Sequence, residues 1–297
     1  MPLIRASLAQ LAFAHLSPAI GAPGWTLDPW VILPLACSLA WYLLGWRKLA
    51  SRSRTHDGSR ARWFLLGWAA LALALVTPLH AAGERSFAAH MLEHELLMLV
   101  AAPLLVISRP IGVALWALPR AARLALSRSG HAVGTAWRFI TRPIVATLVQ
   151  AVALWLWHAP RLFDLALAHP GWHIVQHLCF LVTALLFWWA MLVGRARSHV
   201  GLVVGCLFFT ATVSGALGAL MALSSSPWYA GYAQSGLDAF GLSPAQDQQL
   251  AGLLMWVPGG LVHAGAGLAL LAAILKTRDV ANCESTLSLR RDSATGS

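Results

Sequence analysis

Long apolar runs divide the sequence, and each is long enough to cross a lipid bilayer as a helix. Hydrophobic residues make up 58% of the 297 residues and charged residues only 11%, and the apolar residues occur in blocks instead of alternating with polar ones. The sequence therefore predicts an all-α class, a polytopic helical membrane bundle of about seven transmembrane helices, because about 20 helical residues span ~30 Å of hydrocarbon. We expect the spans at about residues 30–46, 63–79, 90–107, 143–157, 172–193, 200–223 and 249–275.

The basic residues predict the orientation of these spans. All of the 21 Lys and Arg residues lie on one side of the membrane except Arg5, Arg85 and Arg161. Loops rich in Lys and Arg remain in the cytoplasm, so we expect the N-terminus outside and the C-terminus inside. The formal charge of +10 is then a consequence of topology. The expected partner is the membrane lipid bilayer, and no nucleic acid is expected.

Three parts of the chain are expected to lie outside or beside the bilayer. Residues 1–29 are predicted to be a periplasmic N-terminal segment, with a cleaved signal peptide as the alternative reading. The membrane domain covers residues 30–275, and residues 111–126 within it mix apolar residues with Arg. They predict an amphipathic helix on the inner surface or else a solvated connector. Residues 276–297 are expected to form a cytoplasmic polar tail, of which residues 281–297 are polar enough to be disordered.

Two spans begin with the same spacing of polar residues. His90, Glu93 and His94 open the third span, and His173, Gln176 and His177 open the fifth. Residues at i, i+3 and i+4 share one helix face. Ionisable groups in a bilayer normally face the protein interior or a wet cavity and mark functional sites. Seven of the twelve His residues lie near the predicted outer surface: His80, His90, His94, His158, His169, His173 and His177.

This clustering predicts a metal site. Imidazole is the commonest protein ligand of Cu, Zn and Fe, and an i, i+4 pair can direct two rings at one ion. The predicted ligands are His90, His94, His173 and His177, with His158, Asp247 and Met255 as additional candidates. A soft thioether beside imidazole favours copper. Glu93 and Gln176 are expected to orient imidazole rings, and His263 is either an inward waypoint or a hydrogen-bonded core histidine.

Other functions are weaker interpretations of the same residues. Two helices that each carry two His residues can hold haem b, which makes an electron-transfer protein the main alternative. A copper transporter or channel needs polar groups across the whole membrane, and only His263 extends the pattern inward. The H-x-x-E-H spacing at His90 also occurs in inverted zinc proteases, but the second motif has Gln176 in place of Glu. We therefore expect no enzyme activity.

Four runs of the sequence resemble the CtaG family of caa3-type cytochrome c oxidase assembly factors. The runs are His90-Met-Leu-Glu-His-Glu-Leu-Leu-Met-Leu-Val-Ala-Ala-Pro-Leu-Leu-Val106, Trp157-His-Ala-Pro-Arg-Leu-Phe-Asp164, His173-Ile-Val-Gln-His177 and Asp247-Gln-Gln-Leu-Ala-Gly-Leu-Leu-Met-Trp256. The resemblance covers about residues 30–275. Glu93 departs from it, because the family pattern more often has Gln at this position.

The resemblance implies a function in oxidase biogenesis. It implies a multi-pass protein of the bacterial cytoplasmic (inner) membrane that is needed to mature a haem–copper oxidase. Copper delivery is the expected role, and the expected partner is a cytochrome c oxidase subunit or another copper chaperone. Which oxidase is served, and whether metal is bound at rest, stay open at this level.

Overall fold

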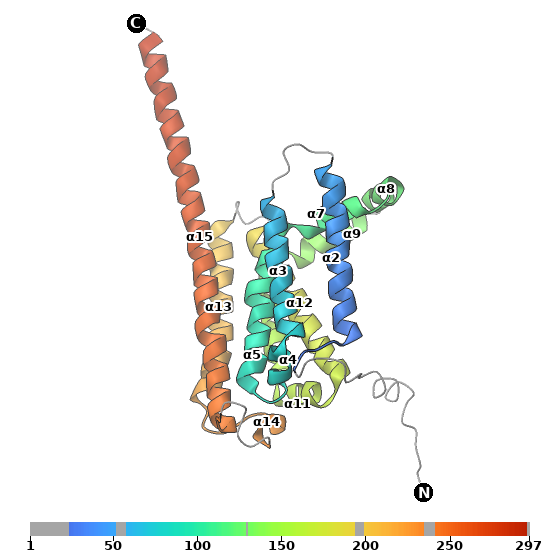
Figure 1. Ribbon diagram of the computed structural model, residues 1–297. Helices are drawn as coiled ribbons and strands as arrows, with labels where there is room; N and C mark the ends of the chain where they lie inside the picture. The colour runs from blue at the N-terminus through green and yellow to red at the C-terminus, as the bar shows by residue number, and fades with distance from the viewer. Residues whose placement is uncertain (1–23, 52–57, 129, 194–198, 235–240, 296–297) are drawn as a thin grey trace.

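The computed structural model describes residues 24–51, 58–128, 130–193, 199–234 and 241–295, and the regular structure in these ranges is helical (Figure 1). Six helices are long and apolar enough to cross a membrane, or seven if one bent pair is counted as a span. The predicted all-helical membrane class is confirmed. The six are α2 (Pro29–Ala50), α3 (Ser59–Val76), a composite helix over Phe87–Ser108, α12 (Pro170–Leu192), α13 (Val200–Leu223) and the first part of α15 (Pro244–Thr295).

The predicted fourth span is the bent pair. α10 (Pro143–Trp157) is only 15 residues long and follows α9 (Gly130–Ile140). The segments Gly134–Ile140 and Pro143–Trp157 are bent by 67° relative to each other. Pro143 explains the break, because proline disfavours helical geometry at the residue before it, and Arg142 has an extended ψ of 135°.

A π-helical turn interrupts the third span. The span consists of α5 (Phe87–Glu95), the π-helix η1 (Leu96–Ala101) and α6 (Ala102–Ser108), and the N–H of Ala102 donates to the carbonyl of Leu97. Pro103 follows directly and has no N–H to continue the α-helical ladder. The wider turn rotates the residues after it relative to a regular α-helix, and such turns are frequent at functional sites.

The helices pack as a bundle in which α15 and α13 lie side by side, α3, α5 and α12 occupy the middle, and α2 lies on the opposite flank (Figure 1). Glycine permits the closest of these approaches. A Cβ atom added to Gly218 on α13 would lie 2.7 Å from the carbonyl oxygen of Gly252 on α15. Small residues at such crossings let two membrane helices approach backbone to backbone.

Three short helices gather at the end of the bundle where α5 and α12 begin. They are α4 (Pro78–Gly83), α11 (Pro160–Ala168) and α14 (Ala230–Ala233) (Figure 1). Each of α4, α11 and α12 starts with proline at its first positions, where the missing N–H costs no hydrogen bond. This end of the bundle contains the histidine motifs.

Two sequence expectations differ from the structure. Residues 111–126 do not form one amphipathic helix but fall into α7 (Pro110–Ala114), the 3₁₀ turn η2 (Leu115–Ala117) and α8 (Arg120–Arg128). Pro119 causes the interruption by holding Leu118 extended, at ψ 152°.

The tail that was expected to be disordered continues α15 to Thr295, because neither Gly nor Pro occurs between Gly267 and that residue to stop the helix. Residues 1–23 of the predicted N-terminal segment lie outside the described residues. The orientation of the termini stays a prediction.

Candidate metal centre

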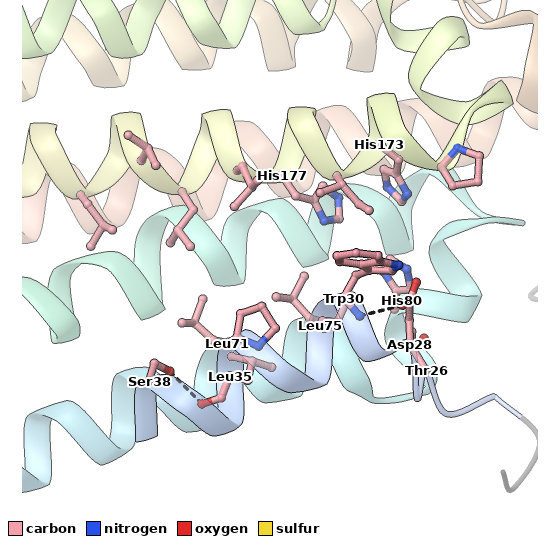
Figure 2. Close-up of a pocket in the computed structure, with 18 of the residues that line it drawn as sticks. Thr26, Asp28, Trp30, Leu35, Ser38, Leu71, Leu75, His80, His173 and His177 are labelled. Carbon is pink, nitrogen blue, oxygen red and sulfur yellow. Dashed lines mark hydrogen bonds between the residues drawn. The ribbon is translucent and has the colours of Figure 1, made fainter. Parts of the chain in front are cut away.

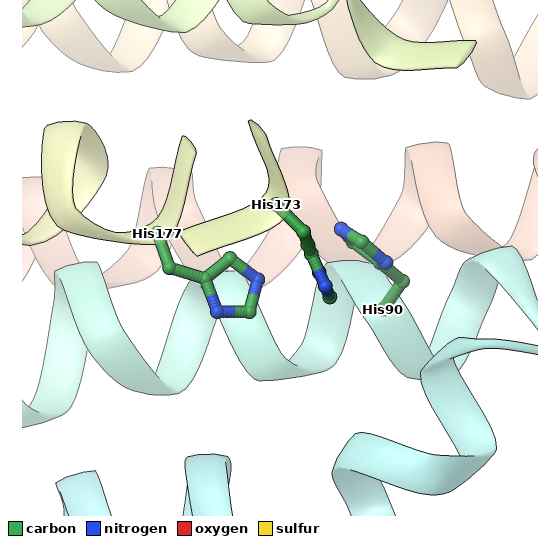
Figure 3. Close-up of side chains that lie close together, drawn as sticks. All are labelled: His90, His173 and His177. Atoms are coloured by element: carbon green, nitrogen blue, oxygen red, sulfur yellow. The ribbon is translucent and has the colours of Figure 1, made fainter. Parts of the chain in front are cut away.

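The two histidine motifs face each other from α5 and α12. One ring nitrogen from each of His90, His173 and His177 lies within 4.8 Å of the other two. The rings of His90 and His173 stack at a centroid distance of 5.2 Å, and His177 lies one turn further along α12 (Figure 3). His90 is 1% exposed and His177 9%. Three imidazole nitrogens at this separation suit a single metal ion.

A second group of ligand atoms overlaps the first at His177. It consists of His80, Glu93 and His177, again with one atom from each within 4.8 Å of the others. We call the five residues His80, His90, Glu93, His173 and His177 the outer cluster. His80 comes from α4, so three separate helices supply the outer cluster.

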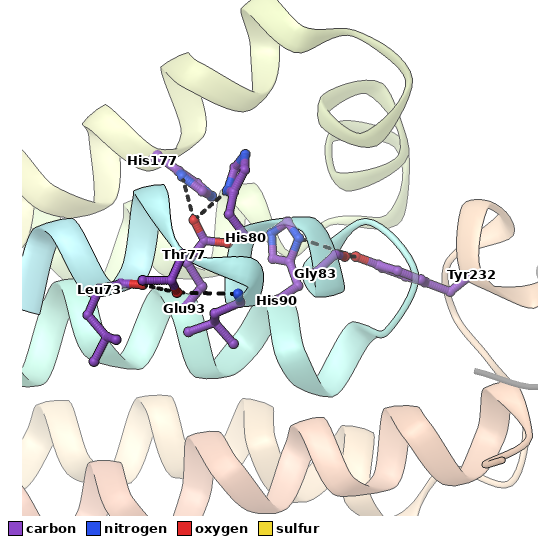
Figure 4. Close-up of polar contacts among 9 residues, drawn as sticks. Leu73, Thr77, His80, Gly83, His90, Glu93, His177 and Tyr232 are labelled. Atoms are coloured by element: carbon purple, nitrogen blue, oxygen red, sulfur yellow. Dashed lines mark hydrogen bonds and ion pairs between the residues drawn. The ribbon is translucent and has the colours of Figure 1, made fainter. Parts of the chain in front are cut away.

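Glu93 fixes the orientation of two rings. Its Oε1 atom lies 2.8 Å from Nδ1 of His80 and 3.5 Å from Nδ1 of His177 (Figure 4). An ionised carboxylate only accepts, so Nδ1 of His80 carries the proton of the hydrogen bond, and the contact with His177 favours a proton on its Nδ1 as well. Whenever either ring is neutral, its Nε2 then keeps a lone pair. Carboxylates that hold metal-binding imidazoles in this way are common behind metal sites. Sequence reasoning had assigned Glu93 such a role.

Tyr232 fixes the tautomer of His90. Its hydroxyl donates to the carbonyl oxygen of Gly83 over 2.6 Å, and the same oxygen lies 3.2 Å from Nδ1 of His90 (Figure 4). A carbonyl can only accept, so the hydroxyl hydrogen points to Gly83 and the phenolic oxygen accepts from the imidazole N–H. The Nε2 atom of His90 then has a lone pair and no hydrogen-bond partner among the described residues.

The charges in the outer cluster are balanced within it. Burial lowers the pKa of His80, but the hydrogen bond and negative charge of Glu93 outweigh this effect and raise the His80 pKa above its ordinary value. An imidazolium at His80 can therefore neutralise the fully buried Glu93. A bound cation would take over this role, so metal binding is expected to release a proton. Burial and neighbouring carboxylates raise the pKa of Tyr232, which keeps it a neutral donor.

His94 and Gln176 are adjacent to the outer cluster. The ring of His94 lies 4.4 Å from that of His90 and 4.9 Å from that of His177, measured between centroids. Neither ring nitrogen of His94 has a partner within the described part of the chain. The side-chain amide of Gln176 is also buried without a partner there, so it does not orient an imidazole as the sequence had suggested.

The structure does not bring the other predicted ligands into the outer cluster. Nδ1 of His158 donates to the carbonyl of Leu154 over 2.7 Å, Nε2 lies 3.4 Å from the sulfur of Met91, and burial lowers the His158 pKa to about 4. Asp247 accepts from Ser86 and from two backbone N–H groups at the start of α5. Met255 and His263 line a separate cavity.

Sequence reasoning missed two contributors, His80 and Tyr232. His80 was counted among the histidines of the outer surface but was not expected to join the two motifs, because its own segment has no i, i+4 partner. The predicted depth of His80, close to that of the two motifs, was the one sequence signal that could have placed it in the site. Tyr232 lies in the short helix α14 between α13 and α15, 142 positions from His90. No local pattern relates the two residues.

A large cavity connects the outer cluster with the space between α2, α3 and α12. Its volume is about 2110 Å³. Apolar side chains such as Leu35, Leu71 and Leu75 line one wall, while His80, His173 and His177 lie at one end (Figure 2). The outer cluster is thus largely buried in the bundle and still adjoins this cavity.

The fold and the site define a multi-span helical membrane protein with a buried cluster of imidazoles and one carboxylate at one end of its bundle. The chain belongs to the cytochrome c oxidase caa3 assembly factor family (Caa3_CtaG), whose model matches residues 40–277. The resemblance seen in the sequence is therefore confirmed.

Curated relatives share part of their length with this chain. Two uncharacterized proteins, from Mycobacterium bovis and Mycobacterium tuberculosis, are each 29% identical over 226 residues. These matches cover 72% of this chain and 34% of each relative, so the chain spans about a third of the length of these relatives. No solved structure matches.

Proposed function

We propose that this protein binds a copper ion at the outer cluster, on the periplasmic side of a bacterial cytoplasmic membrane, and supports insertion of the ion into cytochrome c oxidase. One observation carries the proposal: three imidazole nitrogens, from the buried rings of His90 and His177 and the partly buried ring of His173, lie within 4.8 Å of one another. The family of oxidase assembly factors supplies the biological setting. Because the oxidase that such a factor matures is a haem–copper enzyme, copper is the expected cargo.

The arrangement suits transfer of an ion better than permanent storage. Three imidazoles leave at least one coordination position open on a metal ion. The adjoining cavity gives a partner or a second chaperone access to that position. When the site is empty, the positive charge of protonated His80 cancels the negative charge of Glu93. Release of the ion therefore does not leave an unbalanced buried charge. The protein needs no covalent chemistry for this role.

Metal analysis together with a visible spectrum tests the proposal. Protein purified in detergent and exposed to copper is expected to retain about one to two copper ions per chain, as imidazole-rich sites do, without a Soret band. A Soret band from the purified protein would instead indicate haem b and electron transfer. Retention of zinc in preference to copper, or of no metal at all, would contradict the copper assignment.

Tyr232 provides a finer test of how the outer cluster is organised. Tyr232→Phe removes the hydroxyl that accepts from Nδ1 of His90, so the ring can rotate or change tautomer. We expect copper affinity to fall ~10–100-fold, the usual effect of losing a group that orients a metal ligand. A competition titration with a chromophoric chelator measures the change. Tyr229→Phe is the matched control, because the Tyr229 hydroxyl donates to the carbonyl of His158. Equal affinity in both variants would contradict the role of Tyr232.

A further inference from the structure

A second polar cavity lies deeper in the bundle. Its volume is about 30 Å³, enough for a single water molecule or ion. Helices α5, α10, α12, α13 and α15 and the π-helix η1 enclose it. The polar or sulfur-containing side chains that line it are those of Glu95, Met98, Gln150, Trp188, Thr210, Ser214, Met255 and His263. We call this space the inner cavity.

The inner cavity begins directly below the outer cluster, because Glu95, which lines it, lies two positions beyond Glu93 on α5. Asp247 on α15 caps the first residues of α5, so the two helices begin at one level and run in the same direction. Glu95 lies eight positions after Phe87, and Met255 lies eight positions after Asp247, which places both ~12 Å deeper than these helix starts at ~1.5 Å per residue. Buried His94 directly precedes Glu95 and lies 4.4 Å from the ring of His90. The two sites therefore adjoin along α5.

The polar oxygens that face the inner cavity lack hydrogen donors. Oε2 of Glu95 and Oε1 of Gln150 are buried and have no hydrogen-bond partner in the described ranges. The hydroxyls of Thr210 and Ser214 do not donate to these oxygens, because they donate to the carbonyls of Cys206 and Thr210 on their own helix. Neither Lys nor Arg is among the residues that line the cavity as described.

His263 also offers a lone pair and no proton. Its Nδ1 lies 2.7 Å from the carbonyl oxygen of Gly259. A carbonyl only accepts, so Nδ1 carries the hydrogen and Nε2 of the neutral ring keeps its lone pair. The side-chain N–H of Gln150 donates to the sulfur of Met98 over 3.4 Å. With the sulfur atoms of Met98 and Met255, the lining is therefore rich in electron-pair donors.

We propose that the inner cavity is a second binding site, which holds one soft monovalent cation through Glu95, His263 and the thioethers of Met98 and Met255. A cation bound there pairs with the ionised form of Glu95 and accepts the lone pairs of the imidazole and thioether groups. Thioether and imidazole ligands select reduced copper over hard ions. That the ion is copper rests on the proposed function of the outer cluster, whereas the set of electron-pair donors follows from the inner cavity alone.

Copper stoichiometry and X-ray absorption on the reduced, copper-loaded protein test this site. The wild type is expected to bind about two copper ions, one of them with sulfur ligands. Met255→Leu, which nearly conserves side-chain volume, should remove one copper and most of the sulfur signal. Glu95→Gln should also remove one copper while leaving the sulfur atoms in place. Met191→Leu is the control, because Met191 is fully buried outside the inner cavity.

The outcomes separate the two proposals. One copper per chain without sulfur ligation in the wild type would overturn the inner site, with water as the occupant of the cavity, and would leave the outer cluster intact. One copper with sulfur ligation that survives His177→Ala would support the inner site and contradict the outer one. Equal stoichiometry and sulfur signal in the wild type and Met255→Leu would also overturn the inner site.

Discussion

His177→Ala is expected to abolish copper binding at the outer cluster and, with it, maturation of the oxidase. His177 is the only residue shared by the two groups of ligand atoms, so its loss disrupts both. The Ala variant also removes one partner of Glu93, whose Oε1 lies 3.5 Å from Nδ1 of His177. Removal of a residue that only orients a ligand costs 10–100-fold in affinity, so removal of a ligand is expected to cost at least ~100-fold.

Oxidase activity in membranes and copper bound by the purified protein are the two measurements. His169→Ala is the matched control, since His169 is exposed at the start of α12 and lies outside both groups. The control should keep wild-type values in both assays. Immunodetection of the His177→Ala protein in the membrane shows whether it is inserted. Normal oxidase activity in a variant that is present at the wild-type level would contradict the proposed function.

Asp247→Ala is expected to produce the largest loss of stability. Asp247 is 2% exposed and accepts hydrogen bonds from Ser86 Oγ and from the backbone N–H groups of Phe87 and Ala88. The variant leaves these buried donors unpaired, at a cost of about 1–3 kcal/mol each. It also removes a negative charge from the positive end of the α5 dipole. We expect the free energy of unfolding to fall by roughly 3 kcal/mol or more.

Thermal unfolding in detergent, followed by tryptophan fluorescence, measures this effect. Asp247→Asn should lose less than Asp247→Ala, because the Asn side chain keeps one acceptor oxygen. Asp164→Ala is a second comparison: Asp164 also accepts from two backbone N–H groups, those of Ala230 and Gly231, but it is only partly buried and these hydrogen bonds are exposed. If Asp247→Ala unfolds like the wild type but no longer binds copper, Asp247 is a metal ligand and not a cap.

The spans and the faces of the histidine motifs were predictable because both depend on local periodicity. Apolar runs bounded by charged loops predict the transmembrane helices, and 3.6 residues per turn place His90 and His94 on one face wherever the helix lies. The meeting of the α5 and α12 motifs also followed from their common depth. Shorter elements were harder to predict from the sequence. The amphipathic pattern of residues 111–126 alone predicted one helix, but Pro119 divides this segment.

The composition of each site depended on tertiary structure. His80 belongs to the outer cluster because α4 packs against α5 and places its ring beside Glu93. Asp247 caps the start of α5 and is not a ligand of the outer cluster. Met255 and His263 face the inner cavity with Glu95. The rotation and depth of one helix against another depend on distant contacts, such as Gly218 against Gly252. The sequence by itself therefore determined the helices and their polar faces, and only packing decided which faces meet.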